Sequence, residues 1–455
     1  MKDMGENSWG TGEQKRLKST AGGRGGRETR SRRRVLQAAG GAGTLALAGC
    51  LEETSLEGLI GSTEAAEGPV TVGVLAPNPD GDFVGRSMAR GAEVAVAELN
   101  ERGGIGGRDV ELAVGDTAAN PLEARREYHR LVLEEGADVT VGMFDSPALV
   151  HVMEDIAEQE LLHLTTGAAT TVTSQLIRED YESYKYHFRV GPTNEIDLGR
   201  GTVDFVDGIA PDVGWESVAV LAEDYDWSDG PWSVLQDDLD ETGLDVVLEE
   251  RYPPATDDFV DLYDPVSEQG ADVALVAMAH TGTDALLDWA APPSGRPYPF
   301  AFGGIHVPAQ LPSYYDQTNG ACRYTFSQIS ATANSEPGPL TQDFVSAYES
   351  EFDENPVYTG YTTYEAVMLY DHVVESAGTF DEDDLVPALE DVSFEGATGT
   401  IEFYDRDHEF AHDLQYQGAD TLFFQWQEND DGEGVQEVIW PDEHATSEFV
   451  SPPWL

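Results

Sequence analysis

The sequence predicts an α/β protein built from two lobes, each with a mainly parallel β-sheet covered by helices. Short apolar runs rich in β-branched residues alternate with longer segments of helical periodicity, which is typical of parallel strands joined by right-handed crossovers. The alternation occurs twice, once from Pro69 and again from Trp215. We therefore expect two Rossmann-like sheets, with a ligand cleft between the lobes at the carboxyl ends of the strands.

The first series carries clear start and stop signals for its helices. Asn120 is a good N-cap and Pro121 stands at the first helical position, where proline is best tolerated. Gly103 is expected to end the helix whose apolar face runs from Met88 to Leu99. The expected strands are residues 69–77, 109–117, 138–144 and 161–168, and the other expected helices are residues 121–136 and 148–160.

The second series repeats this order of strand and helix. Pro265 is expected to break the helix in which it stands. Two β-rich pieces near the end of the chain must return to the lobes, because neither could hold a core alone. The expected strands are residues 217–227, 245–252, 272–279, 298–304, 399–404 and 421–428, and the expected helices are residues 231–243, 257–270, 283–291, 361–378 and 381–392.

The beginning of the chain resembles an export signal. Three arginines, Arg32, Arg33 and Arg34, precede an apolar stretch that is too short for a membrane span, and their context resembles a twin-arginine signal. Leu47 to Cys50 resembles a lipobox, whose cysteine becomes the lipidated first residue of the mature protein. The alternative is a disordered basic tail ending in an ordinary cysteine. The thirty residues before Ser31 are long for such a signal, which leaves open a start codon further downstream.

These patterns divide the chain into four parts. We expect a twin-arginine lipoprotein signal peptide at 1–49, an acidic tether at 50–68, a first lobe from 69–194 plus 330–412, and a second lobe from 195–327 plus 415–455. The mature protein is then expected on the extracellular face of the cell membrane, held there by the lipid on Cys50.

The charge of the chain is strongly negative. Residues 1–49 hold 10 Lys and Arg and 4 Asp and Glu, so the remainder holds 15 basic and 82 acidic residues, a net charge of −67. Such a surface repels phosphate backbones and excludes nucleic-acid binding. Self-repulsion would destabilise a compact state in dilute buffer, whereas molar salt reduces the Debye length to about 3 Å and screens it. The composition therefore predicts a halophilic protein.

The sequence contains no pattern of residues typical of catalysis. It has no nucleophile elbow, no phosphate-binding glycine loop and no His-Glu-x-x-His. The acidic stretch 405–414 has Phe410 where a calcium loop needs glycine, so we interpret it as a solvated turn. Cys322 is expected to be a small buried apolar residue. We expect no metal, no cofactor and no catalytic residue.

Ser146 is a candidate ligand contact. It follows a predicted strand and is expected to cap a helix, whose first N–H groups favour anions such as a carboxylate. Thr170 ends the next strand and would lie alongside. The alternative is ordinary capping with no ligand. Trp227 is either a core anchor or a flat wall for a ligand; its Asp- and Gly-rich neighbourhood favours the wall.

Residues 69–146 resemble the leucine/isoleucine/valine-binding proteins of ABC transporters, which have the type I periplasmic-binding fold. The stretch "NERGGIGGRDVEL" at 100–112 is the most specific part, and the likeness extends over about residues 69–426. The resemblance implies two lobes joined by three crossovers, which close on a small solute like a Venus flytrap and present it to a membrane permease without chemistry. It further implies a monomer.

The resemblance also implies a set of ligand contacts. Ser146 matches the serine that holds the ligand carboxylate, and Ala168 and Thr170 match its partners from the next strand. Asn194 matches an aspartate near the first crossover and Trp227 an aromatic residue of the second lobe. One further residue, Phe83, lies in the loop that supplies an aromatic side chain near the ligand.

Two positions depart from the family. Ala279 and Ile305 stand where a tyrosine and a glutamate surround the ligand ammonium. Because a buried ammonium without a carboxylate partner is costly, either Asp145 or Asp226 substitutes or the ligand lacks that group. Amides, urea-like compounds and aromatic or aliphatic acids then join branched-chain amino acids as candidates.

Three functions remain open at this stage. The first is a solute-binding protein of an ABC importer, which takes up a branched-chain amino acid or a similar amino-acid or amide ligand. The second is a cleft hydrolase or amidase, with Ser146 activated by His163 or His306. The third is a sensor-type binding protein for an aliphatic or aromatic acid.

Overall fold

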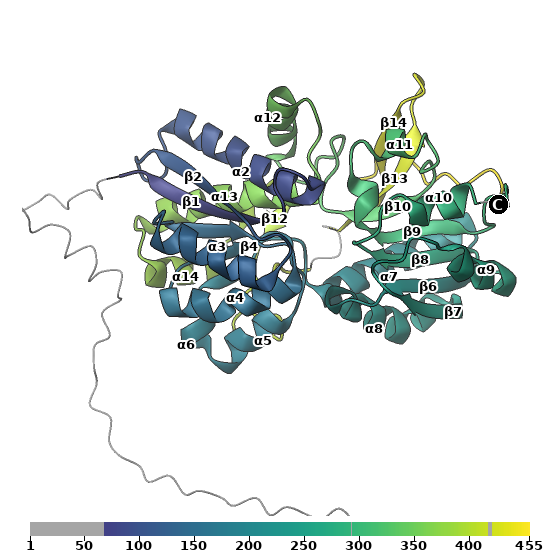
Figure 1. Cartoon of the computed structure of the whole chain (residues 1–455), viewed down its shortest axis with the longest axis horizontal. Coiled ribbons are helices and arrows are strands. Elements are labelled where there is room, and N and C mark those ends of the chain that lie inside the picture. Colours follow the sequence, from purple (N-terminus) through teal and green to yellow (C-terminus); the bar gives the residue numbers. More distant parts are fainter. Residues whose placement is uncertain (1–67, 293, 417–420) are drawn as a thin grey trace, which may run out of the picture. The chain divides into compact units, whose positions relative to one another are not determined.

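The computed structural model describes residues 68–292, 294–416 and 421–455. The predicted export signal, the lipidated Cys50 and the acidic tether fall within residues 1–67, outside the described residues. Two sheets organise the rest of the chain, and we call each sheet with its helices a lobe (Figure 1). The predicted α/β fold with two sheet-based lobes is confirmed.

The first lobe holds a five-stranded parallel sheet in the order β2-β1-β3-β4-β5. Strand β1, which lies between β2 and β3, is almost entirely buried, and this burial explains its apolar sequence. The strands are β1 Val70–Ala76, β2 Val110–Asp116, β3 Val139–Gly142, β4 His163–Thr165 and β5 His187–Arg189.

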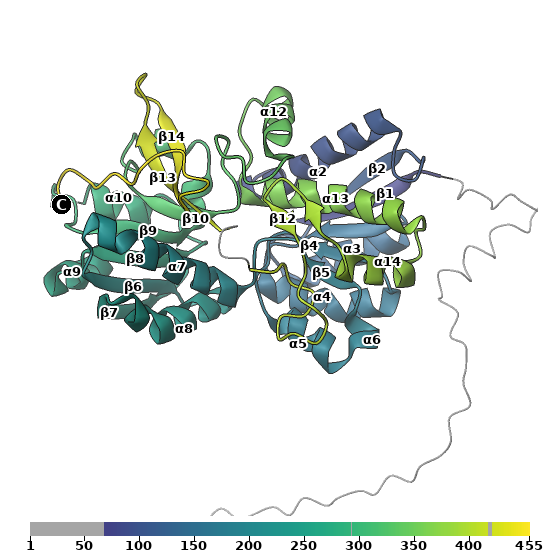
Figure 2. The ribbon, with the colours of Figure 1, turned by 180° about the vertical axis from the view of Figure 1, so that it is seen from behind.

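Helices cover both faces of this sheet. Helix α2 packs along α13, although far apart in sequence, and α3 packs with α4 (Figures 1 and 2). A short hairpin joins β11 Phe394–Glu395 to β12 Thr400–Ile401. The helices are α2 Phe83–Arg102, α3 Pro121–Leu133, α4 Ser146–Gln159, α5 Val172–Glu179, α6 Tyr181–Tyr184, α12 Thr341–Phe352, α13 Tyr358–Ala377 and α14 Glu382–Glu390.

The second lobe holds a seven-stranded sheet in the order β14-β13-β10-β9-β8-β6-β7. Strands β6 to β10 pair in parallel, whereas β13 and β14 add an antiparallel edge. The strands are β6 Ser217–Glu223, β7 Asp245–Tyr252, β8 Val273–Met278, β9 Ala301–His306, β10 Phe326–Ile329, β13 Leu422–Glu428 and β14 Gly434–Trp440.

Alternate residues of β6 pack into separate clusters of buried side chains. Val218 and Val220 join Phe205 of α7, while Ala219 and Leu221 join the cluster that includes residues of α9 and α10. The helices are α7 Glu195–Val213, α8 Asp229–Asp238, α9 Val260–Gln269, α10 Asp284–Ala290 and α11 Tyr314–Gln317, with short 3₁₀ turns η1 Asp226–Ser228, η2 Leu239–Thr242 and η3 Val307–Gln310.

Local signals in the sequence match the structure closely. Asn120 caps α3 by accepting hydrogen bonds from the N–H groups of Leu122 and Glu123. Gly103 ends α2 at φ 107°, in the left-handed region. Burial of Cys322 is confirmed and raises the pKa of its thiol to about 12.

Several expected elements begin or end elsewhere in the structure, and three of the differences concern residues singled out in the sequence. Pro265 does not break its helix: it stands on the exposed side of α9, where its ring meets solvent and only one backbone hydrogen bond is lost. The N-cap of α4 is Asp145, so Ser146 is the first helical residue. The expected strand 217–227 ends at Glu223, and a 3₁₀ turn carries Trp227 instead.

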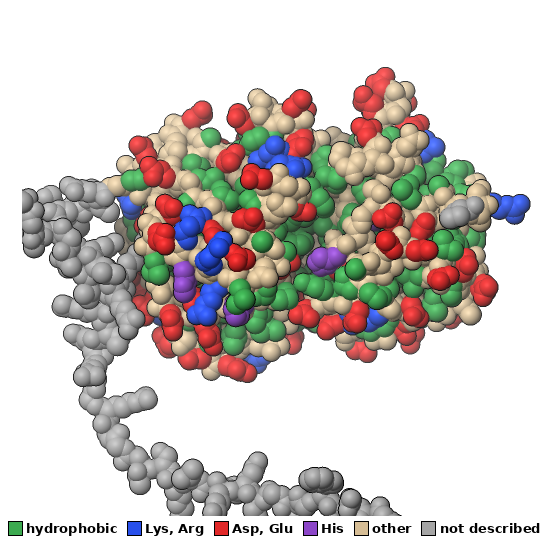
Figure 3. Space-filling model, viewed as in Figure 1, with side chains coloured by type: hydrophobic (Ala, Val, Ile, Leu, Met, Phe, Trp, Pro, Cys, Tyr) green, Lys and Arg blue, Asp and Glu red, His purple; other side chains and the backbone are tan. Residues whose placement is uncertain are grey.

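Acidic side chains are spread over the visible surface, and basic side chains are few (Figure 3). Several arginines on α3 are paired with carboxylates, among them Arg126 with Glu123 at 2.7 Å and Arg125 with Asp155 at 2.8 Å. Among the described helices, none combines the length and the apolar character that crossing a membrane requires.

Candidate functional site: a pocket at the strand ends

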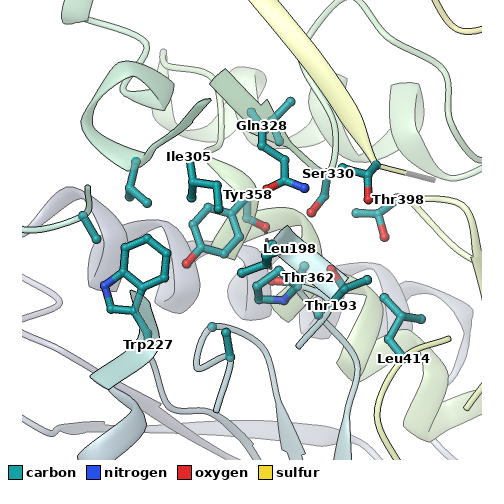
Figure 4. Close-up of a pocket in the computed structure, with 18 of the residues that line it drawn as sticks. Thr193, Leu198, Trp227, Ile305, Gln328, Ser330, Tyr358, Thr362, Thr398 and Leu414 are labelled. Carbon is teal, nitrogen blue, oxygen red and sulfur yellow. Dashed lines mark hydrogen bonds between the residues drawn. The ribbon is translucent and has the colours of Figure 1, made fainter. Parts of the chain in front are cut away.

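A pocket lies where strands of both sheets reach their carboxyl ends. Residues that follow β3, β4, β6 and β8 contribute to it, as expected for parallel sheets. The open space inside it, counted together with the solvent at its mouth, is about 1080 Å³. The close-up in Figure 4 shows Trp227 and Tyr358 near one end of the pocket and Thr398 and Leu414 near the other. Its apolar lining includes Phe144, Ala169, Leu198, Trp227, Ala279, Ile305, Val307, Ile329, Ile401 and Leu414.

A strained turn sets the beginning of α4 at the pocket. Gly142 and Met143 both have positive φ, 113° and 68°. A Cβ on Gly142 would lie 2.4 Å from the carbonyl oxygen of Leu75, so only glycine fits there. Met143 adopts the left-handed region although it is not glycine. Such residues are uncommon, and they cluster at active sites and ligand sites. The next helix therefore begins at the pocket, with Asp145 and Ser146 in the lining.

Ser146 presents a hydroxyl group suited to an anion. The residue is 4% exposed and lines the pocket. Its hydroxyl has no hydrogen-bond partner among the described residues. The first turn of α4 also leaves main-chain N–H groups unbonded within the helix. These N–H groups and the helix dipole favour a negative charge at this point.

Arg189 holds the loop that follows β4. Its guanidinium is fully buried and donates hydrogen bonds to the carbonyl oxygens of Ala168 and Thr170. In a trans peptide, the N–H of Ala169 points opposite to the carbonyl of Ala168, and therefore away from Arg189. Ala169 lines the pocket, and its N–H has no partner among the described residues. The Ala169 N–H is therefore a second donor at the pocket, besides the hydroxyl of Ser146.

Glu223 organises the opposite side of the pocket from within the second lobe. One carboxylate oxygen accepts hydrogen bonds from Trp227 Nε1 at 2.6 Å and His280 Nδ1 at 2.8 Å, and the other accepts the N–H groups of Ala279 and His280, each at 3.1 Å. Burial raises the pKa of Glu223, but the hydrogen bonds from His280 and Ala279 and the charge of His280 together lower it below its ordinary value. Both oxygens of the Glu223 carboxylate therefore already accept two hydrogen bonds each, and the carboxylate fixes the rings of Trp227 and His280.

Asp145 is a buried carboxyl group that the protein itself does not pair. It is 6% exposed, makes no cap hydrogen bond to α4, and has a buried Oδ2 without a partner. Burial raises its pKa, while the charge of His280 lowers it to a smaller extent. The charge of Asp145 in turn raises the pKa of Tyr225 and Tyr358, in each case after the larger effect of burial. A positive ligand group would complete this site.

The structure brings together half of the ligand contacts predicted from the sequence. Asp145, Ser146, Trp227 and Ala279 line the pocket, whereas Phe83, Ala168, Thr170 and Asn194 do not. Trp227 is both buried, at 9% exposure, and part of the wall.

The four residues outside the lining have other contacts. Phe83 opens α2 and packs against the core, and Ala168 and Thr170 lie in the loop held by Arg189. Asn194 caps α7: its Oδ1 accepts hydrogen bonds from the N–H groups of Ile196 and Asp197, and its Nδ2 donates to the Asp197 carboxylate. Their contact with a ligand stays a prediction.

Several lining residues were not predicted from the sequence. Tyr225, His280, Gln310, Gln328 and Tyr358 all line the pocket. Gln328 was detectable in principle, because a polar residue stands in a strand that is buried throughout. Tyr358 was not, because it opens a helix that is distant in sequence from β3, β4, β6 and β8, whose ends form the pocket.

The histidines proposed to activate Ser146 do not reach it. His163 and His306 are fully buried in β4 and β9 and neither lines the pocket. Burial lowers the pKa of each to about 3. Within the described ranges, no group of three or more His, Cys, Asp or Glu side chains is arranged to hold a metal ion. The geometry is that of a binding site.

A two-lobed α/β chain with a solute-sized pocket at its strand ends defines the class of solute-binding proteins. Residues 69–423 match the periplasmic binding protein family, and the chain belongs to that family. It is a non-catalytic solute-binding protein of the ABC transporter type. The hydrolase alternative is therefore set aside.

Curated relatives from Brucella melitensis support this assignment. The chain is 26% identical to Leu/Ile/Val-binding protein homolog 7 over 410 residues, covering 88% of this chain and 98% of the relative. It is also 26% identical to homolog 8 over 378 residues, covering 81% and 89% respectively.

Solved structures share the fold at lower identity. A putative branched-chain amino acid ABC transporter protein from Silicibacter pomeroyi superposes with a TM-score of 0.72 at 20% identity, covering 85% of this chain and 100% of that one. A solute-binding protein from Rhodopseudomonas palustris, in complex with 3,4-dihydroxybenzoic acid, gives 0.67 at 19% identity, covering 85% and 99%. The LivJ protein of Streptococcus pneumoniae, in complex with isoleucine, gives 0.64 at 17% identity, covering 82% and 100%.

Proposed function

We propose that this protein binds a small zwitterionic solute of the amino-acid class and delivers it to the permease of an ABC importer. The observation that supports this most is the pairing of Asp145 with Ser146. These neighbours line one pocket; Asp145 Oδ2 is buried without a hydrogen-bond partner, and the Ser146 hydroxyl makes no hydrogen bond to the described residues. Ser146 and the start of α4 suit a carboxylate, and Asp145 suits an ammonium.

In this proposal Asp145 is the residue that faces the ligand ammonium. The positions expected to hold the ammonium are occupied by Ala279 and Ile305, which carry no charge. Asp145 supplies a carboxylate in the lining, whereas Asp226, the other candidate, is exposed and not part of it. In an α-amino acid the ammonium and the carboxylate are bonded to the same carbon, so the adjacent residues Asp145 and Ser146 could bind one group each.

An aromatic acid is the second candidate. Phe144, Tyr225, Trp227 and Tyr358 give the pocket an aromatic lining, and a related structure holds a dihydroxybenzoic acid. A bound acid without an amino group would, however, leave Asp145 facing a second negative charge. This unfavourable pairing separates the two candidates.

A binding panel tests the proposal. Calorimetric titration in molar salt would compare free L-amino acids, each with the carboxylic acid that lacks its amino group. We expect one-to-one binding of at least one amino acid, and much weaker binding of its deaminated analogue. Tighter binding of 4-hydroxybenzoate than of every amino acid would replace the proposal by the aromatic-acid alternative.

We further propose lipid anchoring outside the cell after twin-arginine export. The support is the order of Arg32, Arg33 and the lipobox-like Leu47 to Cys50 in the sequence. Replacing Cys50 by Ser should release the protein into the medium, whereas replacing Cys322 by Ser should leave it on the membrane. Continued membrane retention of the Cys50→Ser protein would contradict the anchor.

A further inference from the structure

Two glutamine side chains in the second lobe carry buried polar atoms without partners. Gln328, on β10, is 5% exposed, and neither its Nε2 nor its Oε1 makes a hydrogen bond. Gln310, in η3, is 4% exposed; its Nε2 donates to the carbonyl oxygen of Gln328 at 3.0 Å, and its Oε1 has no partner. Because both atoms of the Gln328 amide are open, exchanging its N and O would not pair them.

These amides belong to the pocket. Both glutamines line it, and Figure 4 shows the Gln328 side chain reaching in beside Ser330 and above Leu198. The α7 backbone leaves room for the amide at Gly201, because a Cβ there would lie 2.8 Å from Gln328 Nε2. A small residue on the facing helix thus accommodates the amide.

The unpartnered atoms define what a ligand group must offer here. Gln328 presents one donor and one acceptor, and Gln310 adds a second acceptor. A branched aliphatic side chain would cover these three atoms and offer none of them a hydrogen bond, which is unfavourable. A carboxylate would accept from Nε2 but would face the two carbonyl oxygens with a negative charge.

Among the described residues that line the pocket, none is Arg or Lys, and His280 is the one that can carry a positive charge. Burial lowers the pKa of His280, but the hydrogen bond and charge of Glu223 and the charge of Asp145 together raise it, so a positive charge on this ring already faces two carboxylates of the protein. A carboxamide or urea-type group offers an acceptor oxygen for Gln328 Nε2 and N–H donors for the open oxygens of Gln328 and Gln310, so it can pair all three atoms.

We infer that the pocket selects a solute bearing a carboxamide or urea-type group, which pairs with Gln328 and Gln310, over isosteric branched-chain and carboxylate solutes. This inference rests on the proposed function only in taking the pocket as the solute site. It narrows the amino-acid class to members with an amide-bearing side chain.

Isosteric ligands test this directly. Asparagine, leucine and aspartate have side chains of nearly the same shape and differ in their end groups, and glutamine and glutamate form a longer pair. In calorimetric titrations at molar salt, we expect one of the two amides to bind at least about tenfold more tightly than each of its isosteres. Equal affinities within each set would overturn the inference and leave the proposed function standing.

Two variants connect the preference to Gln328. Gln328→Leu should abolish the preference for the amide without lowering the melting temperature, because it removes unpaired polar atoms. Gly201→Ala should reduce the preference by displacing the amide, and it remains a test if the first variant misfolds. Gln317→Leu, an exposed glutamine of the same lobe, is the control. A preference that survives in both pocket variants would overturn the inference.

Simple amides separate the inference from the proposed function. Propionamide and butyramide carry the amide but neither a carboxylate nor an ammonium. If they bind in a manner that depends on Gln328 while no amino acid binds, the inference holds and the proposed function fails. If no amide-bearing compound binds, with or without an amino-acid group, the inference is overturned.

Discussion

Arg189 and Asp413 lie 224 positions apart in the sequence and form a fully buried ion pair, with Nε and Oδ1 at 2.9 Å. The same guanidinium holds the loop of Ala168 and Thr170, and Asp413 also accepts a hydrogen bond from Ser174 Oγ at 2.8 Å. Replacing Asp413 by Ala would leave the arginine buried and unpaired, so we expect a loss of about 3–5 kcal/mol in the free energy of unfolding. Denaturant titration in molar salt measures this.

A surface pair provides the comparison for that variant. Arg126 and Glu123 are both exposed and lie one helical turn apart on α3. Arg126→Met should change the unfolding midpoint far less than Asp413→Ala, because exposed pairs contribute little. Equal effects of the two substitutions would show that the buried pair does not stabilise the loop.

Ser146→Ala should weaken solute binding by about 1–3 kcal/mol, because the hydroxyl is expected to donate to a charged group. The free energy of unfolding should change little, since the hydroxyl has no partner among the described residues. Ser376→Ala, on α13 outside the pocket, is the control. Unchanged affinity in Ser146→Ala would move the carboxylate site elsewhere.

Asp145→Asn should have opposite effects on binding and stability. The buried carboxyl has a raised pKa in the folded chain, so its contribution to stability is present below the ordinary pKa and is lost as pH rises through the folded value. The variant should therefore unfold at higher temperature at pH 7 and yet bind the solute much more weakly.

The pH dependence of binding provides an independent check on Asp145. An ammonium requires the ionised carboxyl, so affinity in the wild-type protein should fall as pH decreases through the raised pKa of Asp145. Binding to Asp145→Asn should not show this fall. A variant that binds as tightly as the wild type would mean that Asp145 faces no positive group.

Glu365 should make stability depend on pH near neutrality. It is fully buried on α13 and accepts hydrogen bonds from Thr398 Oγ1 at 2.6 Å and from the N–H groups of Ala397 and Thr398 at 3.0 Å. Burial outweighs these bonds and raises its pKa to about 7. The free energy of unfolding should then fall as pH rises from about 4.5 to 7, by an amount on the order of 3 kcal/mol.

Glu365→Gln isolates this effect. Thermal melts of the wild type and the variant between pH 4 and pH 8 should diverge as pH rises, with the variant gaining in relative stability. Glu250→Gln, at an exposed position of β7, should follow the wild type throughout. A constant difference between wild type and Glu365→Gln would show that Glu365 does not titrate in this range.

Low salt should destabilise the protein. The chain beyond residue 49 carries a net charge of −67, and few basic side chains appear on its visible surface (Figure 3). Reducing salt from molar to about 0.1 M lengthens the Debye length from about 3 to about 10 Å and exposes the acidic groups to mutual repulsion. The melting temperature should fall continuously as the salt concentration is lowered. A melting curve that does not change would contradict the halophilic prediction.

Much of the fold was predictable because local chemistry determines it. Buried parallel strands have continuous apolar sequences, and caps such as Asn120 and Gly103 mark helix ends independently of distant contacts. Pro265 was misjudged because tolerance of proline depends on which side of the helix meets solvent.

The site was only partly predictable, because it depends on contacts across long sequence separations. Asp145 and Ser146 follow a strand directly and could be placed from local order. Glu223 acquires its role only where β6 lies beside β8, so that it meets His280, 57 positions away. Nothing local indicates that Gln328 would remain without a hydrogen-bond partner.

A crystal structure of the complex with the amino acid that gives the largest thermal shift would show how the pocket holds its solute. We expect the ligand ammonium within hydrogen-bond distance of the Asp145 carboxylate, and a ligand carboxylate oxygen on Ser146 Oγ at the start of α4. A solute whose carboxylate lies away from α4, with Asp145 facing no positive charge, would contradict this expectation.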